Sequence, residues 1–531
     1  MTDQPDPKQP LTARGTKVLL RSTATFGSMT VLSRITGLVR DILFAQLMGS
    51  TLVADAFFVA FRIPNFFRRI FGEGALSAAF VPVYTQQRVS SSAQEVRGFV
   101  DIVSGRLTLA LVILTIAGII LSPVIVTALA PGFRADADKF QLTVECLRIT
   151  FPYALFVCLV ALSAAILNTH GRFALPAATP ILLNICLIAA ALWITDVTGN
   201  VAIAVSIGVF IAGIVQLAFQ LPSLKKVEAL PRPKLKRKQK GEAEEAANKV
   251  YRLMLPAVFG ASIAQINLMI NTLIASFLVT GSVSWLYYSD RLMEFPLGVF
   301  GVALGSVLLP RLSKEHALES LDEFSRLLDW GMRWCLLISL PATAGLIVLS
   351  ETLVATLFYH GAFTLTDVTM SARALVAFSI GLTALVSVRV LSPGFFSRDD
   401  TKRPVKAGAI AMVVNAIAAI VLVFPFQHVG LAAAISLAAF VNAGLLLFWL
   451  IKDRVFIFRP GWLPFLIRVV AATLIMWYVL AEFLVSPLEM WIENSILVRI
   501  FLLLGYILAG AVIYSACLLV SGIRPRQLIS R

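Results

Sequence analysis

The apolar stretch from Ser33 to Pro82 is interrupted by many charged residues. Most of them are arginines, whose permanent charge and planar array of N–H donors match the oxygen atoms of phosphate groups. Several arginines around one cavity would therefore select a polyanionic ligand. The charged residues of this stretch are Arg34, Arg40, Asp41, Asp55, Arg62, Arg68, Arg69 and Glu73.

Helical spacing decides which of these charges can act together. At about 100° per residue, Asp55, Arg62 and Arg69 lie on one side of a helix, whereas Arg34 and Arg40 point about 120° apart. A charge at the centre of a membrane costs roughly 2.5–3.5 kcal/mol on insertion scales, so it normally faces a protein interior or a watery cavity. We therefore expect a polar cavity, although one wall cannot hold every charge.

A second interruption, YYSDRLMEFPLGVFG, lies in the later part of the chain. It brings Asp290, Arg291 and Glu294 within about one helical turn of one another. A cavity formed between the two charged segments would be mainly cationic on one wall and mixed on the other.

The elements that position these charges are membrane helices. The chain has 531 residues, of which 58% are hydrophobic, more than a soluble core requires. Roughly 20 apolar residues cross a bilayer, and we predict about fourteen such segments in an all-α polytopic membrane protein. They are 26–48, 55–82, 101–128, 146–168, 177–196, 200–222, 253–279, 284–310, 331–350, 369–392, 407–425, 430–451, 462–485 and 496–520.

The distribution of Lys and Arg between these segments predicts the orientation. Basic residues gather in the N-terminal tail, in the linker that contains KLKRKQK, and in the loops SRDDTKRPVK and IKDRVFIFRP. These loops and both termini are therefore expected in the cytoplasm. The asymmetry explains most of the net charge of +15, so nucleic acid is not an expected partner. KLKRKQK is read as a solvated loop, with docking onto anionic lipid as the alternative.

Sliding the chain on itself by 228 residues reveals a weak internal repeat. The offset places ALSAAFVP on ALGSVLLP, and it places Pro176 on Pro404. From this repeat we predict two parallel six-helix lobes and, after them in the chain, a C-terminal helix pair. The predicted domains are a cytoplasmic extension (1–25), the first lobe (26–224), a basic linker (225–249), the second lobe (250–452), and the final two helices with the tail (453–531).

Motifs for covalent chemistry are missing from the sequence. It contains neither a GxxxxGK[ST] loop nor a nucleophile elbow, its five cysteines form no CxxC pair, and its four histidines are scattered. We therefore predict a protein that is not an enzyme and that uses no metal or cofactor.

Five motifs together resemble the MurJ family of bacterial lipid II flippases, within the multidrug/oligosaccharidyl-lipid/polysaccharide exporter superfamily. They are SRITGLVRD, DAFFVAFRIPNFFRRIFGEGALSAAFVP, APGFRADADKF, ILNTHGRFALPA and WLYYSDRLMEFPLGVFGVALG. The resemblance implies fourteen helices and a cationic central cavity. It also implies that the last two helices form a groove for the polyprenyl tail. It also implies that the substrate-binding residues are Arg34, Arg40, Arg68 and Arg291, and that Asp55, Arg62 and Glu294 are further important charges.

The resemblance and the arginines together predict a mechanism. Lipid II would cross from the inner to the outer leaflet of the bacterial cytoplasmic membrane by alternating access, with its tail in the hydrocarbon. If about two negative charges cross, an inside-negative potential of 100 mV favours export by roughly 4–5 kcal/mol. Coupling to sodium or protons stays open. We expect a monomer that contacts membrane lipids, with cell-wall synthesis proteins as further partners.

Other functions remain as alternatives. A related flippase would carry another polyprenyl-linked oligosaccharide. A drug/cation antiporter of the same superfamily would need an acidic cavity, which the arginines do not provide. A non-transporting scaffold for cell-wall synthases would use the buried charges as structural ion pairs. A membrane glycosyltransferase or phosphatase would need a catalytic loop that the sequence does not offer.

Overall fold

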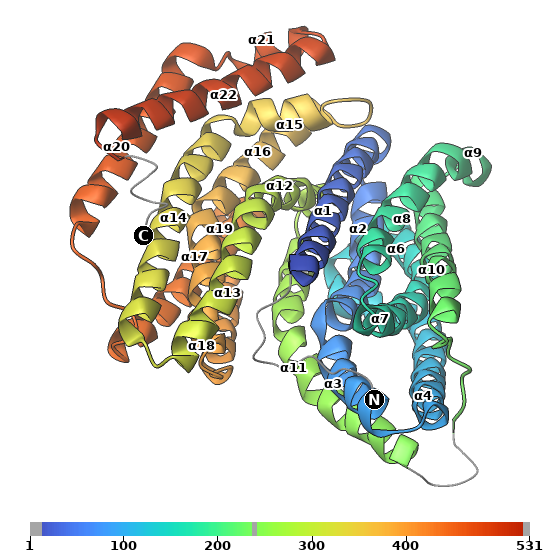
Figure 1. Ribbon diagram of the computed structural model, residues 1–531. Coiled ribbons are helices and arrows are strands. Elements are labelled where there is room, and N and C mark those ends of the chain that lie inside the picture. Colours follow the sequence, from blue (N-terminus) through green and yellow to red (C-terminus); the bar gives the residue numbers. More distant parts are fainter. Residues whose placement is uncertain (1–12, 236–241, 524–531) are drawn as a thin grey trace. The chain divides into compact units, whose positions relative to one another are not determined.

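The structure is a computed structural model that describes residues 13–235 and 242–523, which form helices and no strands. Parts of three predicted regions lie outside the described residues: the N-terminal extension, the KRKQK portion of the linker and the C-terminal tail. The first eleven helices (Figure 1) are α1 (Ala13–Met48), α2 (Leu52–Phe67), α3 (Leu76–Ser90), α4 (Ala93–Ile120), α5 (Ser122–Leu129), α6 (Ala137–Thr150), α7 (Tyr153–Thr169), α8 (Ala174–Ala189), α9 (Thr195–Thr198), α10 (Val201–Lys226) and α11 (Glu242–Ala275).

Eleven further helices follow in the second half of the chain. They are α12 (Ser282–Pro296), α13 (Val302–Ala317), α14 (Leu321–Val348), α15 (Ser350–Phe358), α16 (Leu365–Ile380), α17 (Leu382–Leu391), α18 (Pro393–Phe396), α19 (Lys402–Lys452), α20 (Trp462–Val479), α21 (Leu488–Glu493) and α22 (Ile496–Val520). Short π-helical segments are η1 (Arg68–Ala75), η3 (Ala190–Ile194), η4 (Leu297–Gly301) and η5 (Leu480–Leu484), and η2 (Pro131–Ala135) is a 3₁₀ turn.

Ten helical segments of the described chain are long and apolar enough to cross a membrane. The predicted fold class, an all-helical polytopic membrane protein, is confirmed, and the count of fourteen is approximate. The predicted segments 26–48 and 55–82 are not among the ten, because both carry several charges. The predicted segment 253–279 contributes a shorter apolar helix, Gln265–Ala275.

The predicted segments 407–425 and 430–451 both lie within α19. Gln427 has non-helical backbone angles there (φ 49°, ψ −129°), so α19 consists of two helices joined at a kink. Pro425 lies two residues before the kink and cannot donate a backbone hydrogen bond to the preceding turn. The kink therefore falls between the two predicted spans.

The contacts between Cα atoms divide the chain into two compact units. Residues 45–59 and 127–140 belong to the second unit, although their neighbours in the chain belong to the first. The lobe bounds inferred from the repeat stay a prediction. The first unit is Met1–Phe44, Ala60–Val126 and Gln141–Ser262, and the second is Ala45–Val59, Thr127–Phe140 and Ile263–Arg531.

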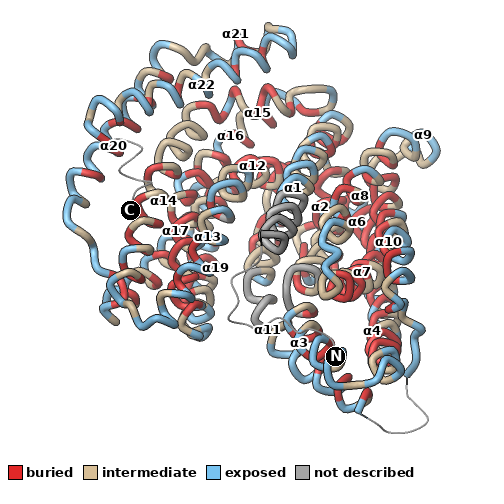
Figure 2. Tube along the Cα trace, viewed as in Figure 1, coloured by how far each residue is buried: buried red, intermediate tan, exposed pale blue. Residues whose placement is uncertain are grey.

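Within the first unit, α7 and α10 pack closely and are largely buried (Figure 2). Two polar side chains cross this apolar interface and satisfy each other. The Tyr153 hydroxyl donates to Gln216 Oε1 over 3.3 Å, and Gln216 Nε2 donates to the Thr179 carbonyl over 2.7 Å. These bonds offset the penalty of burying polar groups among apolar neighbours.

Within the second unit, α20 and α22 lie beside α14 and α15 (Figure 1). Leu337 of α14, Val469 and Met476 of α20, and Tyr514 of α22 share one apolar cluster. The Tyr514 hydroxyl also donates to the Leu337 carbonyl over 2.7 Å. The side of α20 that faces α14 is therefore closed by packing, while the other sides of α20 and α22 remain largely exposed (Figure 2).

Small residues allow the close approach of α19 to the junction of α16 and α17. A Cβ at Gly381 would lie only 2.6 Å from Ser436 Oγ, so this contact requires a glycine. Ser436 Oγ in turn donates to the Ala377 carbonyl over 2.6 Å. Such small-residue contacts are typical of helices packed in membranes.

The π-helical segments η1 and η4 occupy corresponding places in the sequence. Shifted by the 228-residue offset, η1 would cover positions 296–303, which include all of η4. π-Helical turns are rare and often lie at functional sites. Each occurs in one of the two charged segments singled out above.

Candidate functional site

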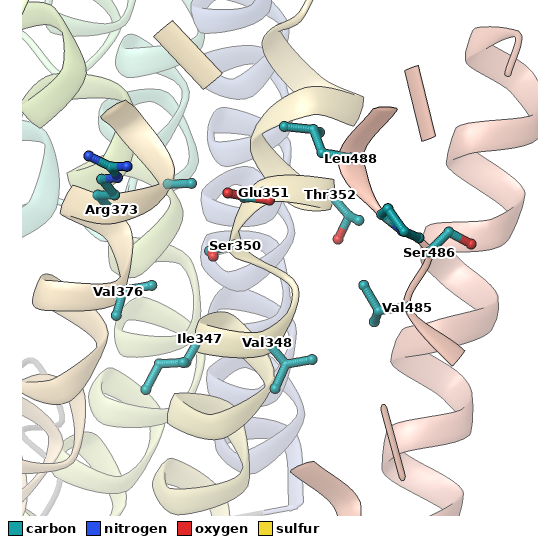
Figure 3. Close-up of a pocket in the computed structure, with 12 residues that line it drawn as sticks. Ile347, Val348, Ser350, Glu351, Thr352, Arg373, Val376, Val485, Ser486 and Leu488 are labelled. Atoms are coloured by element: carbon teal, nitrogen blue, oxygen red, sulfur yellow. The ribbon is translucent and has the colours of Figure 1, made fainter. Parts of the chain in front are cut away.

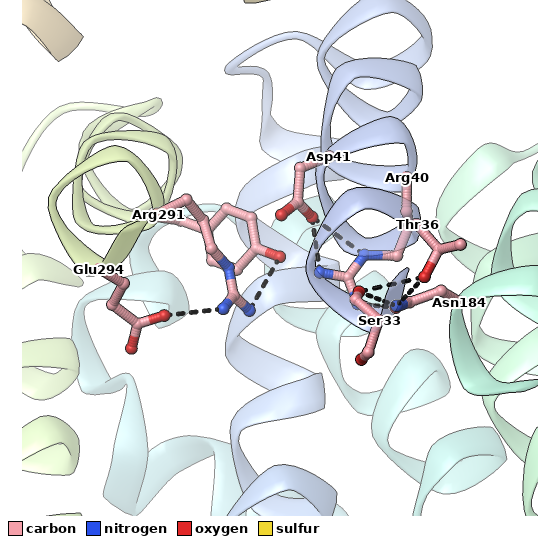
Figure 4. A network of polar contacts seen from close by, with 8 residues as sticks. Ser33, Thr36, Arg40, Asp41, Asn184, Arg291 and Glu294 are labelled. Carbon is pink, nitrogen blue, oxygen red and sulfur yellow. Dashed lines mark hydrogen bonds and ion pairs between the residues drawn. The ribbon is translucent and has the colours of Figure 1, made fainter. Parts of the chain in front are cut away.

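Arg40 of α1 is the most enclosed of the predicted substrate-binding residues, with 6% of its surface exposed. Its Nε and one terminal nitrogen donate to Asp41 Oδ1 over 2.9 and 2.7 Å. Its other terminal nitrogen donates to Asn184 Oδ1 over 2.9 Å (Figure 4). The guanidinium also lies 5.7 Å from the centre of the Phe44 ring. Arg40 is therefore held in a fixed orientation.

Asn184, on α8, connects Arg40 to the preceding turns of α1. Its amide nitrogen donates to the Ser33 carbonyl over 3.1 Å and to Thr36 Oγ1 over 3.0 Å (Figure 4). Because the same amide oxygen accepts from Arg40, one side chain joins α8 to three positions of α1. Asn184 is not among the residues predicted from the sequence, where its one signal is a lone amide side chain in an apolar segment.

Three other predicted arginines of the first unit are half-buried. Arg34 lies on α1, Arg62 on α2, and Arg68 at the start of η1. Arg68 Nε donates to Asn65 Oδ1 over 2.9 Å, which orients its guanidinium. These three residues are less buried than Arg40.

Asp55 lies in the first turn of α2 and is almost completely buried. It supplies the N-terminal cap that α12 lacks, because Gly281 at that position has no side chain. Asp55 Oδ2 accepts from the Gly281 amide over 2.9 Å. Oδ1 accepts from the Ser284 amide over 3.0 Å and from Ser284 Oγ over 2.6 Å. A carboxylate at a helix N-terminus is favourable because it satisfies free N–H groups and complements the helix dipole.

Lys139, in the first turns of α6, completes this group. Its ammonium lies 2.8 Å from Asp55 Oδ2 and 4.2 Å from the centre of the Phe133 ring, with a weaker contact to Thr280 Oγ1 at 3.4 Å. We call Asp55, Lys139, Gly281 and Ser284 the Asp55 network. All four belong to the second unit, and they tie the starts of α2, α6 and α12 together.

Arg291 and Glu294 of α12 lie together, as their spacing predicted. Arg291 donates to Glu294 Oε2 over 3.0 Å, and both side chains are about one-third exposed. A second terminal nitrogen contacts the Tyr287 hydroxyl at 3.4 Å, and the guanidinium lies 5.0 Å from the centre of the Tyr287 ring. Tyr287 stacks on Phe58 with ring centres 3.9 Å apart. The Arg291 guanidinium therefore makes a cation–π contact with the Tyr287 ring.

The predicted site residues thus fall into separate groups in the structure. The first unit holds Arg40 with Asn184, and Arg68 with Asn65. The second unit holds the Asp55 network and the Arg291–Glu294 pair. Lys139 and Tyr287 were not predicted as partners, although both stand in the motifs quoted above. Within the described residues, no group of three or more His, Cys, Asp or Glu side chains is placed to hold a metal ion.

The helices and their candidate membrane spans define a polytopic helical membrane protein. Residues 44–502 match the sequence profile of the family described as Lipid II flippase MurJ, and the chain belongs to this family. It is 40% identical to the probable lipid II flippase MurJ of Haemophilus influenzae over 95% of this chain and 100% of the relative. The relative from Vibrio cholerae is 41% identical over 96% of this chain and 98% of its own.

Solved structures agree with this assignment. The structure titled "Lipid II flippase MurJ, inward closed conformation" superposes with a TM-score of 0.78 at 28% identity, covering 93% of this chain and 98% of its own. An inward-facing multidrug resistance MATE family transporter of the MOP superfamily gives 0.66 at 15% identity, covering 81% and 98%. The second likeness is one of fold alone.

Proposed function

We propose that this chain is a flippase that moves lipid II from the inner to the outer leaflet of the bacterial cytoplasmic membrane. The observation that carries this proposal is the nearly end-to-end match to lipid II flippase relatives, which covers 100% and 98% of the length of the two relatives named above. The relatives form a transporter family, and the proposed cycle requires no covalent chemistry or cofactor.

The half-buried arginines Arg34, Arg68 and Arg291 are proposed to bind the pyrophosphate and sugar of the head group. The planar guanidinium groups match phosphate oxygens in charge and geometry, and the neighbouring Asn65 and Tyr287 hold two of them in place. Arg40 is proposed to act through charge from a fixed, enclosed position. Arg62, Asp55 and Glu294 are proposed to support the conformational cycle.

Alternating access requires helix ends on one side of the membrane to separate while those on the other side meet. The Asp55 network is a natural place for this change, because four donors converge on one carboxylate where three helices begin. The membrane potential is the proposed energy source, since an exported anion moves down an inside-negative potential. The excess of Lys and Arg in these loops supports a cytoplasmic location for both termini. A single chain suffices for this cycle, with membrane lipids around it.

Depletion in the host tests the function. The chromosomal copy is placed under a repressible promoter, and lipid II in the outer leaflet is measured by its accessibility to a membrane-impermeant hydrolase added outside spheroplasts. We expect lipid II to accumulate in protected form as the protein disappears, and to become accessible when the wild-type chain is supplied again. Unchanged accessibility during depletion would reject the proposal in favour of a scaffold role, provided that no second flippase is expressed.

A further inference from the structure

A cavity of about 430 Å³ opens in the second unit where α14 ends and α15 begins (Figure 3). α16 forms one wall, and the connection between η5 and α21 forms another. We call it the Glu351 pocket. It is lined by Ile347, Val348, Ser350, Glu351, Thr352, Ala372, Arg373, Val376, Val485, Ser486, Pro487 and Leu488.

Two opposite charges stand in this lining without partners. Glu351 and Arg373 are both exposed, and within the described part of the chain neither side chain makes a hydrogen bond or an ion pair. This contrasts with Arg333 of the same unit, which pairs with Asp329 at 2.8 Å. Figure 3 shows Glu351 and Arg373 on different helices. The pocket therefore presents a cation and an anion to the same ligand.

The depth of Arg373 in its helix favours an anionic ligand. It lies eight residues into α16, about 12 Å along the helix from Leu365, inside the candidate membrane span Leu365–Phe396. An exposed guanidinium at that depth is costly unless an anion or water reaches it. A phosphate group near the membrane surface would supply that anion through charge-assisted hydrogen bonds.

Below the charges, the pocket continues as apolar surface. Arg373, Val376 and Ile380 follow one another at i, i+3 and i+7, so they share one face of α16. Ile380 is 51% exposed, and Val376 is half-buried. On the facing wall, Ile347 and Val348 are half-buried as well. A ligand with a charged head and a hydrocarbon chain fits this sequence of polar and apolar surface.

We propose that the Glu351 pocket binds a phospholipid whose head group carries one phosphate and one primary ammonium. Arg373 takes the phosphate, with the Ser350 and Ser486 hydroxyls as further donors, and Glu351 accepts the ammonium. An anionic lipid without an amine would meet the uncompensated Glu351 carboxylate. A quaternary amine would need an aromatic cage, and the described lining contains no aromatic ring. The orientation proposed above places this lipid in the outer leaflet, but the binding itself does not rest on the flippase function.

Native mass spectrometry of the full-length, delipidated protein tests this site. Phosphatidylethanolamine, phosphatidylglycerol and phosphatidylcholine with identical acyl chains are added separately, and the bound fraction is measured. We expect phosphatidylethanolamine to bind most tightly. Glu351→Gln should weaken its binding about tenfold and strengthen that of phosphatidylglycerol, which then no longer meets a carboxylate, whereas Arg373→Gln should weaken all three, because charge-assisted bonds are lost.

Matched controls use charged residues outside the pocket. Glu489→Gln on the neighbouring α21 and Arg134→Gln in η2 remove exposed charges that do not line it. Both should bind lipid as the wild type does, and thermal unfolding should show that all four variants are folded. Equal binding of the three lipids, a preference for phosphatidylglycerol, or equal effects of pocket and control substitutions would each overturn the proposal.

Discussion

The Lys139 ammonium lies 2.8 Å from the Asp55 carboxylate, and both side chains are at most 5% exposed. The two residues are not equally dependent on each other. Without Lys139, Asp55 keeps three donors, from the Gly281 amide and from the amide and hydroxyl of Ser284. Without the Asp55 charge, Lys139 loses its carboxylate partner at 2.8 Å, while its contacts with the Phe133 ring and, at longer range, with Thr280 remain.

This asymmetry yields a first prediction. Removing one partner of a buried ion pair costs about 3–5 kcal/mol because the other charge stays buried and unpaired. We therefore expect Asp55→Asn to lower the free energy of unfolding by about that amount, and Lys139→Met to lower it less. The double variant should recover part of the loss. Chemical unfolding of the purified protein measures all three.

An exposed ion pair provides the control for this comparison. Arg97 and Glu228 are 2.5 Å apart, but their side chains are 59% and 77% exposed. Such pairs contribute about 1 kcal/mol or less, so Glu228→Gln should change stability little. If Asp55→Asn proved no more harmful than Glu228→Gln, the Asp55 network would not be a stabilising contact.

The Asn184 side chain gives a second prediction. Asn184→Leu removes one acceptor for Arg40 and two donors to α1, and it leaves the buried guanidinium with fewer partners. We expect a loss of about 1–3 kcal/mol, the range for hydrogen bonds that involve charged groups, together with reduced lipid II export. Asn184→Asp, which keeps the acceptor, should lose less stability. Export and unfolding are measured in parallel, and an Asn184→Leu variant with wild-type values of both would contradict the assigned role.

Contacts between neighbours in the sequence were predictable, and contacts between distant segments were not. Arg291 and Glu294 are three residues apart on one helix, so their pairing follows from the helical repeat. The bond from Arg40 to Asn184 spans 144 residues, and the Asp55–Lys139 pair spans 84. Such pairs depend on which helices pack together, and periodicity within one segment carries no information about that.

The fold followed from hydrophobicity, and its irregularities did not. Long apolar segments predicted the helices because a bilayer requires internal hydrogen bonding. The π-helical turns η1 and η4 and the assignment of residues 45–59 to the second unit depend on tertiary packing. The kink at Gln427 coincides with the expected loop, where Pro425 and polar residues interrupt the apolar pattern.

Tyr287 provides a third prediction, about how Arg291 is held. Tyr287→Phe keeps the ring beside the guanidinium and removes the weak 3.4 Å contact of the hydroxyl with Arg291, so export should fall less than twofold. Tyr287→Ala removes the ring and its stacking on Phe58, and it should lower export about tenfold, since cation–π and stacking contacts contribute about 0.5–1.5 kcal/mol each. Equal export by both variants would show that the Tyr287 ring does not hold Arg291 in its functional position.

The fourth prediction concerns the three proposed ligand arginines and Arg40. Alanine at Arg34, Arg68 or Arg291 should abolish export while the membrane abundance stays near normal, because these side chains are only half-buried. Arg40→Ala should also lower abundance, because Arg40 pairs with the buried Asp41. Lysine keeps the charge without the planar fork, so it should retain partial export at sites where charge matters more than geometry.

Export and immunodetected abundance of these eight variants are compared with those of a matched control. Arg134→Ala removes an exposed arginine from η2 and should export normally. Full activity of the alanine variants at Arg34, Arg68 and Arg291, or inactivity that tracks lost protein, would mean that these arginines are not anion ligands.

The last prediction concerns the lipid tail and the C-terminal helix pair. The side of α20 that faces α14 is filled by Val469, Met476 and their neighbours, so a polyprenyl chain can contact only the exposed sides. Leu474 of α20 and Leu508 of α22 are 57% and 65% exposed. Glutamine at either position should reduce lipid II export and leave the melting temperature unchanged, because no packed contact is lost.

Met476→Gln is the matched control for these two substitutions. It places the same amide in the packed cluster, where an unsatisfied polar group costs about 1–3 kcal/mol, so it should lower the melting temperature. Binding of a soluble head-group analogue that lacks the tail should be normal in the Leu474→Gln and Leu508→Gln variants. If these two variants lost head-group binding and export to the same extent, the exposed sides of α20 and α22 would not be the path of the tail.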